Sequence, residues 1–513
     1  MYATTRLPDD WTPEVIGKML GDGFHLGPTR ALQLAYLDTF DWRLAVRGSR
    51  LWLETASGRS TLHWVRQHGV PIYTVPIGLD PVVADDLPEG FLQNEIAPLI
   101  GVRALITVGS CRIRRHVAGI RDHDGNSAVH LHLERVRFLV PSGKATGTTL
   151  SVAHVFGAPG LERVFERTVE GFASLVPGGG GALDLLELAA AQGGRSIGDY
   201  SSKIRFSLDR DMASEAALRQ IVSGLLETLV ANVDGSVNDL DTEFLHDLRV
   251  AARRTRTALT QIKGVVPKNT IKPFLEGFKW LGSVTGECRD LDVHLQDIRR
   301  YRRAHPDLDE ALDPLTRAVE EARARAYEDV RTGLRSRRFA DLVCDWEAYL
   351  EGPTPGVAPA KARRPIRITA SKTILKAYRR MVDRGVRLGE DPSAGELHRL
   401  RIDGKNLRYL LEFFRSLYPA KKVDRLIKEL KTVQDVLGGF NDAKNQQTRL
   451  DVFMGSMDPT EESDAMTLVA VEHLTAALEQ RQEDIRRTFA GQFRSFAHPK
   501  SQDLYQSLFG SEV

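Results

Sequence analysis

The 513-residue sequence predicts an α+β multidomain protein with a β-rich N-terminal part and an all-α C-terminal part. Three observations support this fold class. Apolar and polar residues alternate in several segments before residue 177, as in half-buried strands. From about residue 198 apolar residues recur with the period of amphipathic helices. A motif with helical spacing occurs twice in this second part, which indicates an internal repeat.

The β-rich part contains three clear segments of alternation. Residues 50–53, 104–117 and 128–140 are predicted to form strands. Residues 122–126, Asp-His-Asp-Gly-Asn, have the composition of a hairpin loop between the last two strands. Residues 161–175 are predicted to form a helix that closes the region.

Two breaks divide the chain. Pro177 is followed by four glycines, which predicts a domain of residues 1–177 and a glycine-rich linker of residues 178–197. Residues 351–359, rich in proline and glycine, precede the basic run 361–364, which is typical of a solvated linker. The helical domain is therefore expected to span residues 198–513. Its halves are expected to cover about 198–352 and 365–513.

A basic quartet with helical spacing occurs once in each half. Each copy is spaced i, i+3, i+7, i+10, and equivalent residues lie 152 positions apart. These positions fall within an arc of roughly 80° on one helix face. Like charges at this spacing repel, so each stripe predicts an anionic partner. The stripes are His246, Arg249, Arg253 and Arg256, and His398, Arg401, Lys405 and Arg408.

The repeat extends beyond the quartets without a gap. Lys279 matches Lys431, Gly286 matches Gly438, and Asp290 matches Asp442. We expect the glycines to end helices and the aspartates to act as N-caps of the following helices. Two related bundles about a pseudo-two-fold would bring both stripes to one shared cleft.

Composition limits the classes of function. The net charge is only +2, so attraction for a polyanion has to come from local clusters. No apolar run approaches the length of a membrane helix, and the start of the chain lacks the apolar core of a secretory signal. The three cysteines form no CxxC pair. These features predict a cytoplasmic protein with no membrane partner.

The helical part resembles a CHAD domain over about residues 198–510. The first half of the motif pattern is found at 245–254, 279–282 and 288–293, and the second at 397–402, 405–409, 434–438 and 441–442. The resemblance implies two pseudo-symmetric four-helix bundles and a basic channel that binds inorganic polyphosphate. It implies no catalysis, and it suggests association with polyphosphate granules.

The N-terminal part resembles a CYTH domain through residues 36–48, YLDTFDWRLAVRG, which implies an antiparallel β-barrel. Arg112, Arg114, Arg115 and Glu134 are found about where that family has its tunnel strands. CYTH enzymes open with an ExExK strand that binds metal and triphosphate, whereas residues 1–7 contain no glutamate. Without paired carboxylates little would hold the two divalent ions. We therefore expect a degenerate CYTH-like domain without catalytic residues.

The predicted polyphosphate ligands are the two stripes together with nearby cations. The full set is His246, Arg249, Arg253, Arg256, Lys279, Arg289, His398, Arg401, Lys405, Arg408 and Lys431, with Arg254, Lys372, Lys376 and Arg379 as further candidates. An arginine side chain can donate hydrogen bonds to two phosphate oxygens at once. A histidine beside polyphosphate should become protonated, so the affinity for polyphosphate should rise as the pH falls toward 6. The alternative is surface ion pairing, for instance of Arg289 with a nearby aspartate.

Metal binding, catalysis and nucleic-acid binding are the other functions to consider for these residues. Neither His246 nor His398 has a metal-ligating side chain four residues away, so we expect no metal and no cofactor. A metal-dependent triphosphatase or polyphosphate-processing enzyme remains the alternative function. Nucleic-acid binding is the second alternative, although few aromatic residues lie among the stripes. The sequence does not specify an oligomeric state.

Overall fold

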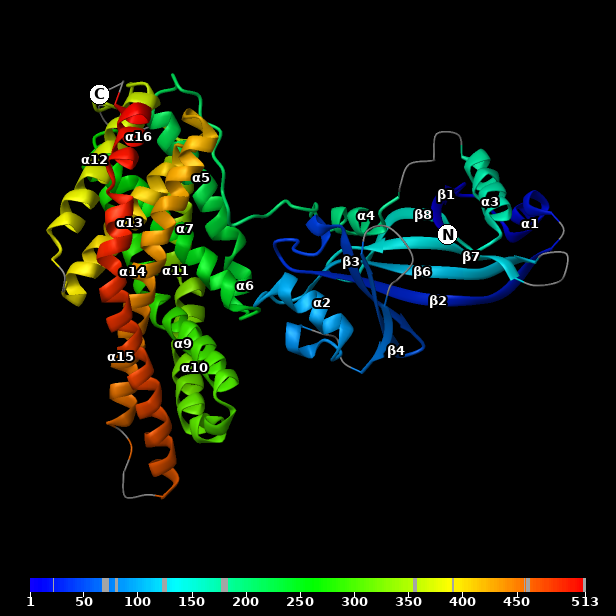
Figure 1. Cartoon of the computed structure of the whole chain (residues 1–513). Coiled ribbons are helices and arrows are strands. Elements are labelled where there is room, and N and C mark those ends of the chain that lie inside the picture. Colours follow the sequence, from blue (N-terminus) through cyan, green and yellow to red (C-terminus); the bar gives the residue numbers. More distant parts are fainter. Residues whose placement is uncertain are drawn as a thin grey trace. The chain divides into compact units, whose positions relative to one another are not determined.

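The computed structural model describes residues 1–21, 23–66, 73–78, 82–121, 127–176, 183–353, 358–389, 392–455, 457 and 462–510. The chain divides into two compact units, Met1–Ser202 and Lys203–Val513. The first contains an antiparallel sheet and the second is helical (Figure 1). The predicted hairpin loop 122–126, the Pro177–Gly181 boundary and residues 354–357 of the second break lie outside the described residues.

The first unit is built on one eight-stranded sheet of order β1-β8-β7-β6-β2-β3-β4-β5. Its predicted strands and closing helix are confirmed as β3, β6, β7 and α3. The elements are β1 (Tyr2–Leu7), α1 (Pro13–Leu20), β2 (Phe24–Asp38), η1 (Ala45–Arg47), β3 (Ser49–Ala56), β4 (Arg59–Arg66), β5 (Tyr73–Ile77), η2 (Ala84–Asp86), α2 (Phe91–Ile100), β6 (Ile106–Arg121), β7 (Ser127–Leu139), β8 (Ala145–Gly157), α3 (Glu162–Leu175) and α4 (Leu185–Ala191).

The sheet is antiparallel as predicted, but the prediction that it closes into a barrel is wrong. Strands β1 and β5 are the two edges of the sheet, and no ladder joins them among the described residues. Helices bury the faces instead. α1 and α3 pack with one part of the sheet around Phe172, and α2 packs with another part around Trp64. The sheet therefore stays open.

Part of the opposite face of the sheet is covered by α4. Leu186 and Ala190 pack into a cluster with strand residues such as Leu34 and Val136. A side chain at Gly109 would place its Cβ 2.8 Å from Ala189, so the glycine permits this close approach. Because α4 lies within residues 178–197, that segment is not simply a glycine-rich linker. Its second part belongs to the fold of the first unit.

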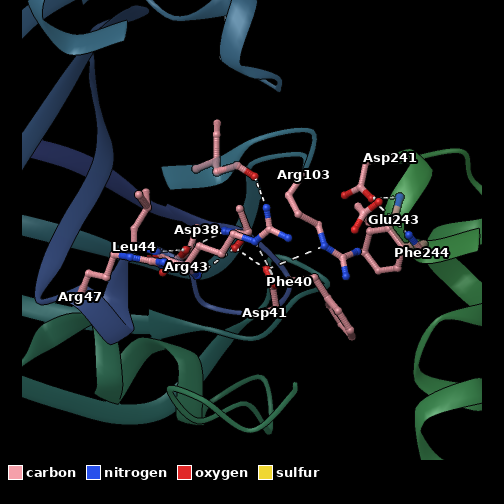
Figure 2. A network of polar contacts seen from close by, with 12 residues as sticks. Asp38, Phe40, Asp41, Arg43, Leu44, Arg47, Arg103, Asp241, Glu243 and Phe244 are labelled. Atoms are coloured by element: carbon pink, nitrogen blue, oxygen red, sulfur yellow. Dashed lines mark hydrogen bonds and ion pairs between the residues drawn. The ribbon is translucent and has the colours of Figure 1, made fainter. Parts of the chain in front are cut away.

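The CYTH-like motif forms a turn held by a buried carboxylate. Asp38 accepts hydrogen bonds from the amides of Thr39, Leu44 and Ala45 at 2.7–2.9 Å. Figure 2 shows Asp38 beside Leu44. Burial raises the pKa of Asp38 to about 6, although these amides favour the charged form. Arg43 donates to Asp41 at 3.0 Å. Asp38 and Asp41 therefore stabilise the local fold of this motif through these hydrogen bonds.

Apart from one isolated β-bridge between Ala213 and Pro365, the regular secondary structure in the described part of the second unit is helical. No helix in the described part of the chain is long and apolar enough to cross a membrane. The elements are α5 (Ser214–Ala231), α6 (Val233–Val237), α7 (Thr242–Gln261), α8 (Lys268–Val284), α9 (Gly286–Ala304), η3 (Pro306–Leu308), η4 (Glu310–Leu312), α10 (Asp313–Arg335), α11 (Arg337–Glu351), α12 (Ile366–Arg387), α13 (Ala394–Phe413), η5 (Arg415–Leu417), α14 (Ala420–Met454), α15 (Glu462–Phe496) and α16 (Pro499–Phe509).

The internal repeat sets the helix bounds of this unit. α7 and α13 begin and end at positions 152 residues apart, and so do the starts of α5 and α12 and of α8 and α14. Leu248 and its repeat partner Leu400 are both fully buried in one hydrophobic core that includes both halves. The two halves therefore fold as one body.

The two halves differ at one junction. In the first half the chain breaks at Thr285 between α8 and α9, whereas α14 continues through the equivalent positions. Gly286 is the first residue of α9 and Gly438 lies inside α14, so neither ends a helix as predicted. Asp290 and Asp442 lie within helices and are not N-caps. This leaves both carboxylates available to neighbouring side chains.

Candidate functional site

The two basic stripes lie on α7 and α13, which are positioned by well-formed N-caps. The Asp241 carboxylate accepts from the amides of Glu243 and Phe244 at 2.8 and 3.2 Å (Figure 2). Ser393 and Glu396 form a capping box at the start of α13. α7 and α13 also contact each other through an ion pair between Arg254 and Glu412. The caps and this cross-link fix the helices that carry the stripes.

Residues of both stripes line one cleft of about 250 Å³, here called the central cleft. Its walls come from α7, α9, α13 and α14. The lining contains six arginine or lysine side chains and two aspartates. It consists of His246, Arg249, Val250, Arg253, Arg289, Asp290, Val293, His294, Arg401, Lys405, Asp442, Asn445, Gln446 and Arg449.

Many of the lining residues form pairs that are related by the internal repeat. Arg249 and Arg401 are repeat partners, as are Arg253 and Lys405, and Asp290 and Asp442. Val293 with Asn445 and His294 with Gln446 continue the series. The central cleft therefore lies where equivalent surfaces of the two halves face each other.

The α7 side of the cleft holds its arginines through neutral partners. Arg249 donates to the Gly282 carbonyl at 2.9 Å and to Thr285 Oγ1 at 2.8 Å. Burial lowers the pKa of Arg249, and Asp290 offsets this in part. Arg253 donates from Nε to the Tyr409 hydroxyl at 2.8 Å. Neutral oxygens leave much of the guanidinium charge uncompensated.

The α13 side shows the same incomplete compensation. Arg401 lies 3.4 Å from Asp442, and burial lowers the pKa of Arg401. Lys405 forms no ion pair with the described residues. Burial, followed by repulsion from Arg253 and Arg401, lowers the pKa of Lys405 to about 7. The site thus carries crowded, half-buried positive charge, which an anion would stabilise.

This pKa predicts a pH-dependent affinity for anions. Lys405 is charged below about pH 7 and neutral above it, so anion binding should weaken as the pH rises from 6 to 8. We expect about a ten-fold change in the dissociation constant, since a hydrogen bond to a charged group contributes about 1.5–3 kcal/mol. Lys405→Arg keeps its charge and should flatten the profile. An equally steep profile in that variant would assign the dependence to histidines instead.

Several predicted ligands lie outside the central cleft. Arg256, Lys279 and Lys431 are exposed. Arg408 pairs with Glu412 at 2.7 Å, in keeping with the ion-pair alternative. His398 is exposed, and its Nδ1 lies 2.8 Å from Asn441 Oδ1.

The remaining predicted cations divide between structural and cleft positions. Arg254 is buried and pairs with Glu412. Arg289 lines the central cleft, donates to the Thr242 carbonyl at 3.2 Å and lies 3.6 Å from Glu243. Lys372, Lys376 and Arg379 line a different cleft, on α12 and α13.

Sequence reasoning missed two basic side chains of the lining, His294 and Arg449. His294 is 3% exposed, and neither ring nitrogen has a hydrogen-bond partner among the described residues. Burial, together with Arg449, lowers the pKa of His294 to about 4. The repeat could not identify them, because their partner positions hold Gln446 and Asp297. Only the packing of α9 against α14 brings them to the cleft.

The first unit holds its own polar cluster on the sheet face that α4 partly covers. Arg115 contacts Glu134 at 2.6 Å and Glu54 at 3.0 Å. His154 lies 3.3 Å from Glu134 and 2.9 Å from the Tyr2 hydroxyl. These polar groups satisfy one another. Arg112 and Arg114, predicted for the same tunnel, are exposed.

The two acids of the polar cluster, Glu54 and Glu134, are both held by Arg115, unlike the metal-binding carboxylate pairs of a metal-dependent phosphohydrolase. Strand β1 presents Tyr2, Thr4 and Arg6 at alternate positions, without a carboxylate. Within the described ranges, no group of three or more histidine, cysteine, aspartate or glutamate residues is placed to hold a metal ion. The fit of these residues to two divalent ions is therefore poor.

Comparison with known proteins identifies the helical unit. Residues 220–451 match the family model described as the CHAD domain, and the chain contains a CHAD domain there. No curated protein matches the chain. A crystal structure of the CHAD domain from the plant Ricinus communis is 26% identical, with 58% of this chain and 96% of that chain covered and a TM-score of 0.48.

Two further solved structures show weaker likeness. PptA from Streptomyces chartreusis is 15% identical, with coverage of 55% and 99% and a TM-score of 0.45. A Hippeastrum protein described with a dominant triphosphatase activity is 21% identical, with coverage of 34% and 85% and a TM-score of 0.24. These scores lie below 0.5, so the CHAD assignment rests on the family model.

Proposed function

We propose that the chain binds inorganic polyphosphate in the central cleft without hydrolysing it. The observation that supports this most is the repeated basic lining, in which six arginine or lysine side chains face two aspartates. Polyphosphate presents a run of anionic oxygens and no base edge. Its recognition requires many charge-assisted hydrogen bonds along a track, which is what paired stripes on two facing helices can supply.

The state of the arginines also favours an anionic ligand. Burial lowers the pKa values of Arg249 and Arg401, and their carboxylate neighbours compensate them only in part. Phosphate oxygens would restore that compensation, and the planar guanidinium can donate to two of them. His294, a buried residue of the same lining, has ring nitrogens able to bond an oxygen.

Nucleic acid fits the lining less well. Binding of single strands normally uses aromatic side chains on which bases stack. The central cleft is lined by no phenylalanine, tyrosine or tryptophan among the described residues. A titration of labelled long-chain polyphosphate, with an oligonucleotide of equal charge as competitor, tests the proposal. We expect saturable polyphosphate binding and weak competition. Equal competition would favour the nucleic-acid alternative.

The enzymatic alternative predicts turnover in the first unit. Because β1 has no carboxylate and the Arg115–Glu134 cluster is internally satisfied, we expect no phosphate release from tripolyphosphate with Mg²⁺ or Mn²⁺. Phosphate release by the full chain measures this directly, with Glu134→Gln as the control variant. Sustained release that this substitution abolishes would contradict the non-catalytic assignment.

Binding is proposed to take place in the cytoplasm, where the protein would be associated with polyphosphate granules. Co-localisation of the tagged full chain with stained granules would test this, and the variants of the central cleft provide the control. A tagged wild type that stays diffuse in cells rich in granules would contradict it.

A further inference from the structure

A second, larger cleft lies on α12 and α13 in the second half of the helical unit. Its volume is about 860 Å³. Seven lysine or arginine side chains and two acidic side chains line it. None of these residues belongs to the lining of the central cleft. We call it the lateral cleft.

Part of this charge has a structural role. The buried Asp403 pairs with Arg380 at 2.9 Å and with Arg384 at 2.6 Å. Glu396, one of the two acids, accepts hydrogen bonds from Ser393 at the N-cap of α13. These groups hold α12 and α13 together. These contacts give a structural role to two of the seven cationic side chains and to one of the two acidic side chains that line the lateral cleft.

Three further cations that α12 contributes to the lateral cleft lack such partners among the described residues. Lys372, Lys376 and Arg379 are exposed at spacing i, i+4, i+7, which places them on one helix face. None of the three forms an ion pair within the described residues, and Arg379 makes only a long contact of 3.4 Å to Gln506. Adjacent like charges destabilise a helix by a few tenths of a kcal/mol. The face therefore gains nothing in stability from them.

The internal repeat provides a comparison for this face. The equivalent positions of α5 are Gln220, Gly224 and Glu227. α5 starts 152 residues before α12 and forms the same bundle element without these cations. The fold consequently does not require a basic face here, and these lateral cations are particular to the second half of the repeat.

We propose that the lateral cleft is a second polyanion site, which takes a further stretch of the polymer held in the central cleft. This inference rests on the proposed function. α13 contributes Arg399 to the lateral cleft and Arg401 to the central cleft. His398 is exposed, and by helix geometry it lies on the arc between those two arginines. A polymer can thus pass from one cleft to the other across α13.

Two linked sites make affinity depend on chain length. A long polyphosphate fills both clefts, and the second contact is intramolecular, which multiplies the affinity. Tripolyphosphate has only three phosphate units, and we expect it to occupy one cleft at a time. The repeat positions in α5 lack these cations, so the polymer leaves the pseudo-symmetric central cleft preferentially on the α12 side.

The test compares a triple variant with a control of equal charge change. Lys372→Ala, Lys376→Ala and Arg379→Ala remove the lateral cations. Lys421→Ala, Lys422→Ala and Lys428→Ala remove three exposed cations of α14 that line neither cleft. Each full-length protein is titrated with tripolyphosphate and with long-chain polyphosphate at several salt concentrations, and helix content is checked by circular dichroism.

The lateral variant should lose at least about ten-fold of its long-chain affinity and keep its tripolyphosphate affinity. Its log–log salt slope for long chains should fall by roughly two, at somewhat under one per lost contact. The control should retain both affinities. Equal long-chain affinity of variant and control, or equal losses for both ligands, would overturn the lateral site. No binding of either ligand by the wild type would instead overturn the proposed function.

Discussion

Replacing Arg249, Arg253, Arg401 and Lys405 by glutamate is expected to abolish polyphosphate binding. These side chains form two repeat pairs in the lining of the central cleft. A hydrogen bond to a charged group contributes about 1.5–3 kcal/mol, so losing four corresponds to at least about 10⁴-fold in affinity. The new carboxylates add repulsion. Fluorescence anisotropy with labelled polyphosphate would measure the loss.

A matched control distinguishes the loss of contacts in the central cleft from a general change in the electrostatic field of the protein. Arg256, Lys279, Lys428 and Lys431 are exposed on the same unit and line neither cleft. Glutamate at these four positions changes the net charge equally, yet should weaken binding much less. Arg253→Gln with Lys405→Gln gives a milder variant if the fourfold change impairs folding. Undiminished binding in both cleft variants would show that the site is elsewhere.

Removing Arg115 is expected to destabilise the first unit by about 3–5 kcal/mol, as when a buried ion pair loses one partner. Glu134 is fully buried; burial opposes its ionisation, but His154 and Arg115 outweigh that effect and lower its pKa to about 2. Arg115→Met leaves this carboxylate with His154 alone. Hydrogen exchange of peptides from β6 to β8 would report the loss separately from the helical unit.

The same cluster gives a pH test with a defined sign. The folded-state pKa of Glu134 lies below its usual value of 4.5, so its contribution to stability is full above about pH 4.5 and is lost as the pH falls toward 2. Arg115→Met should reduce that dependence. Arg112→Ala, on the same strand but exposed, should change stability by less than about 0.5 kcal/mol. Similar effects of both substitutions would refute the buried-pair account.

The amino-acid sequence predicts the helices that carry the candidate site because the same residues show both the internal repeat and the helical period. The starts and ends of α7 and α13 keep the 152-residue offset, and Arg249, Arg253, Arg401 and Lys405 meet in one cleft. The position of a residue within a stripe does not by itself show whether its side chain lines the central cleft. Arg256 and Arg408 follow the same spacing, but they lie at the ends of the stripes, away from the cleft.

Other features depend on tertiary packing and could not be predicted. α14 continues where α8 ends, so Gly438 is interior to a helix although its repeat partner Gly286 is the first residue of one. His294 has a glutamine as its repeat partner, and nothing local marks it as part of the lining. α4 follows the glycine run, and only its packing on the sheet shows that it belongs to the first unit.

Amine footprinting of Lys405 tests the central claim most directly. The full chain is treated with an amine-acylating reagent with and without saturating long-chain polyphosphate, and the modification rates of Lys405 and Lys431 are followed by mass spectrometry. Lys405 lines the central cleft and Lys431 is exposed outside it. Polyphosphate in the cleft should slow acylation of Lys405 strongly and leave Lys431 nearly unchanged. Bound polyphosphate that leaves the Lys405 rate unaltered would contradict binding in the central cleft.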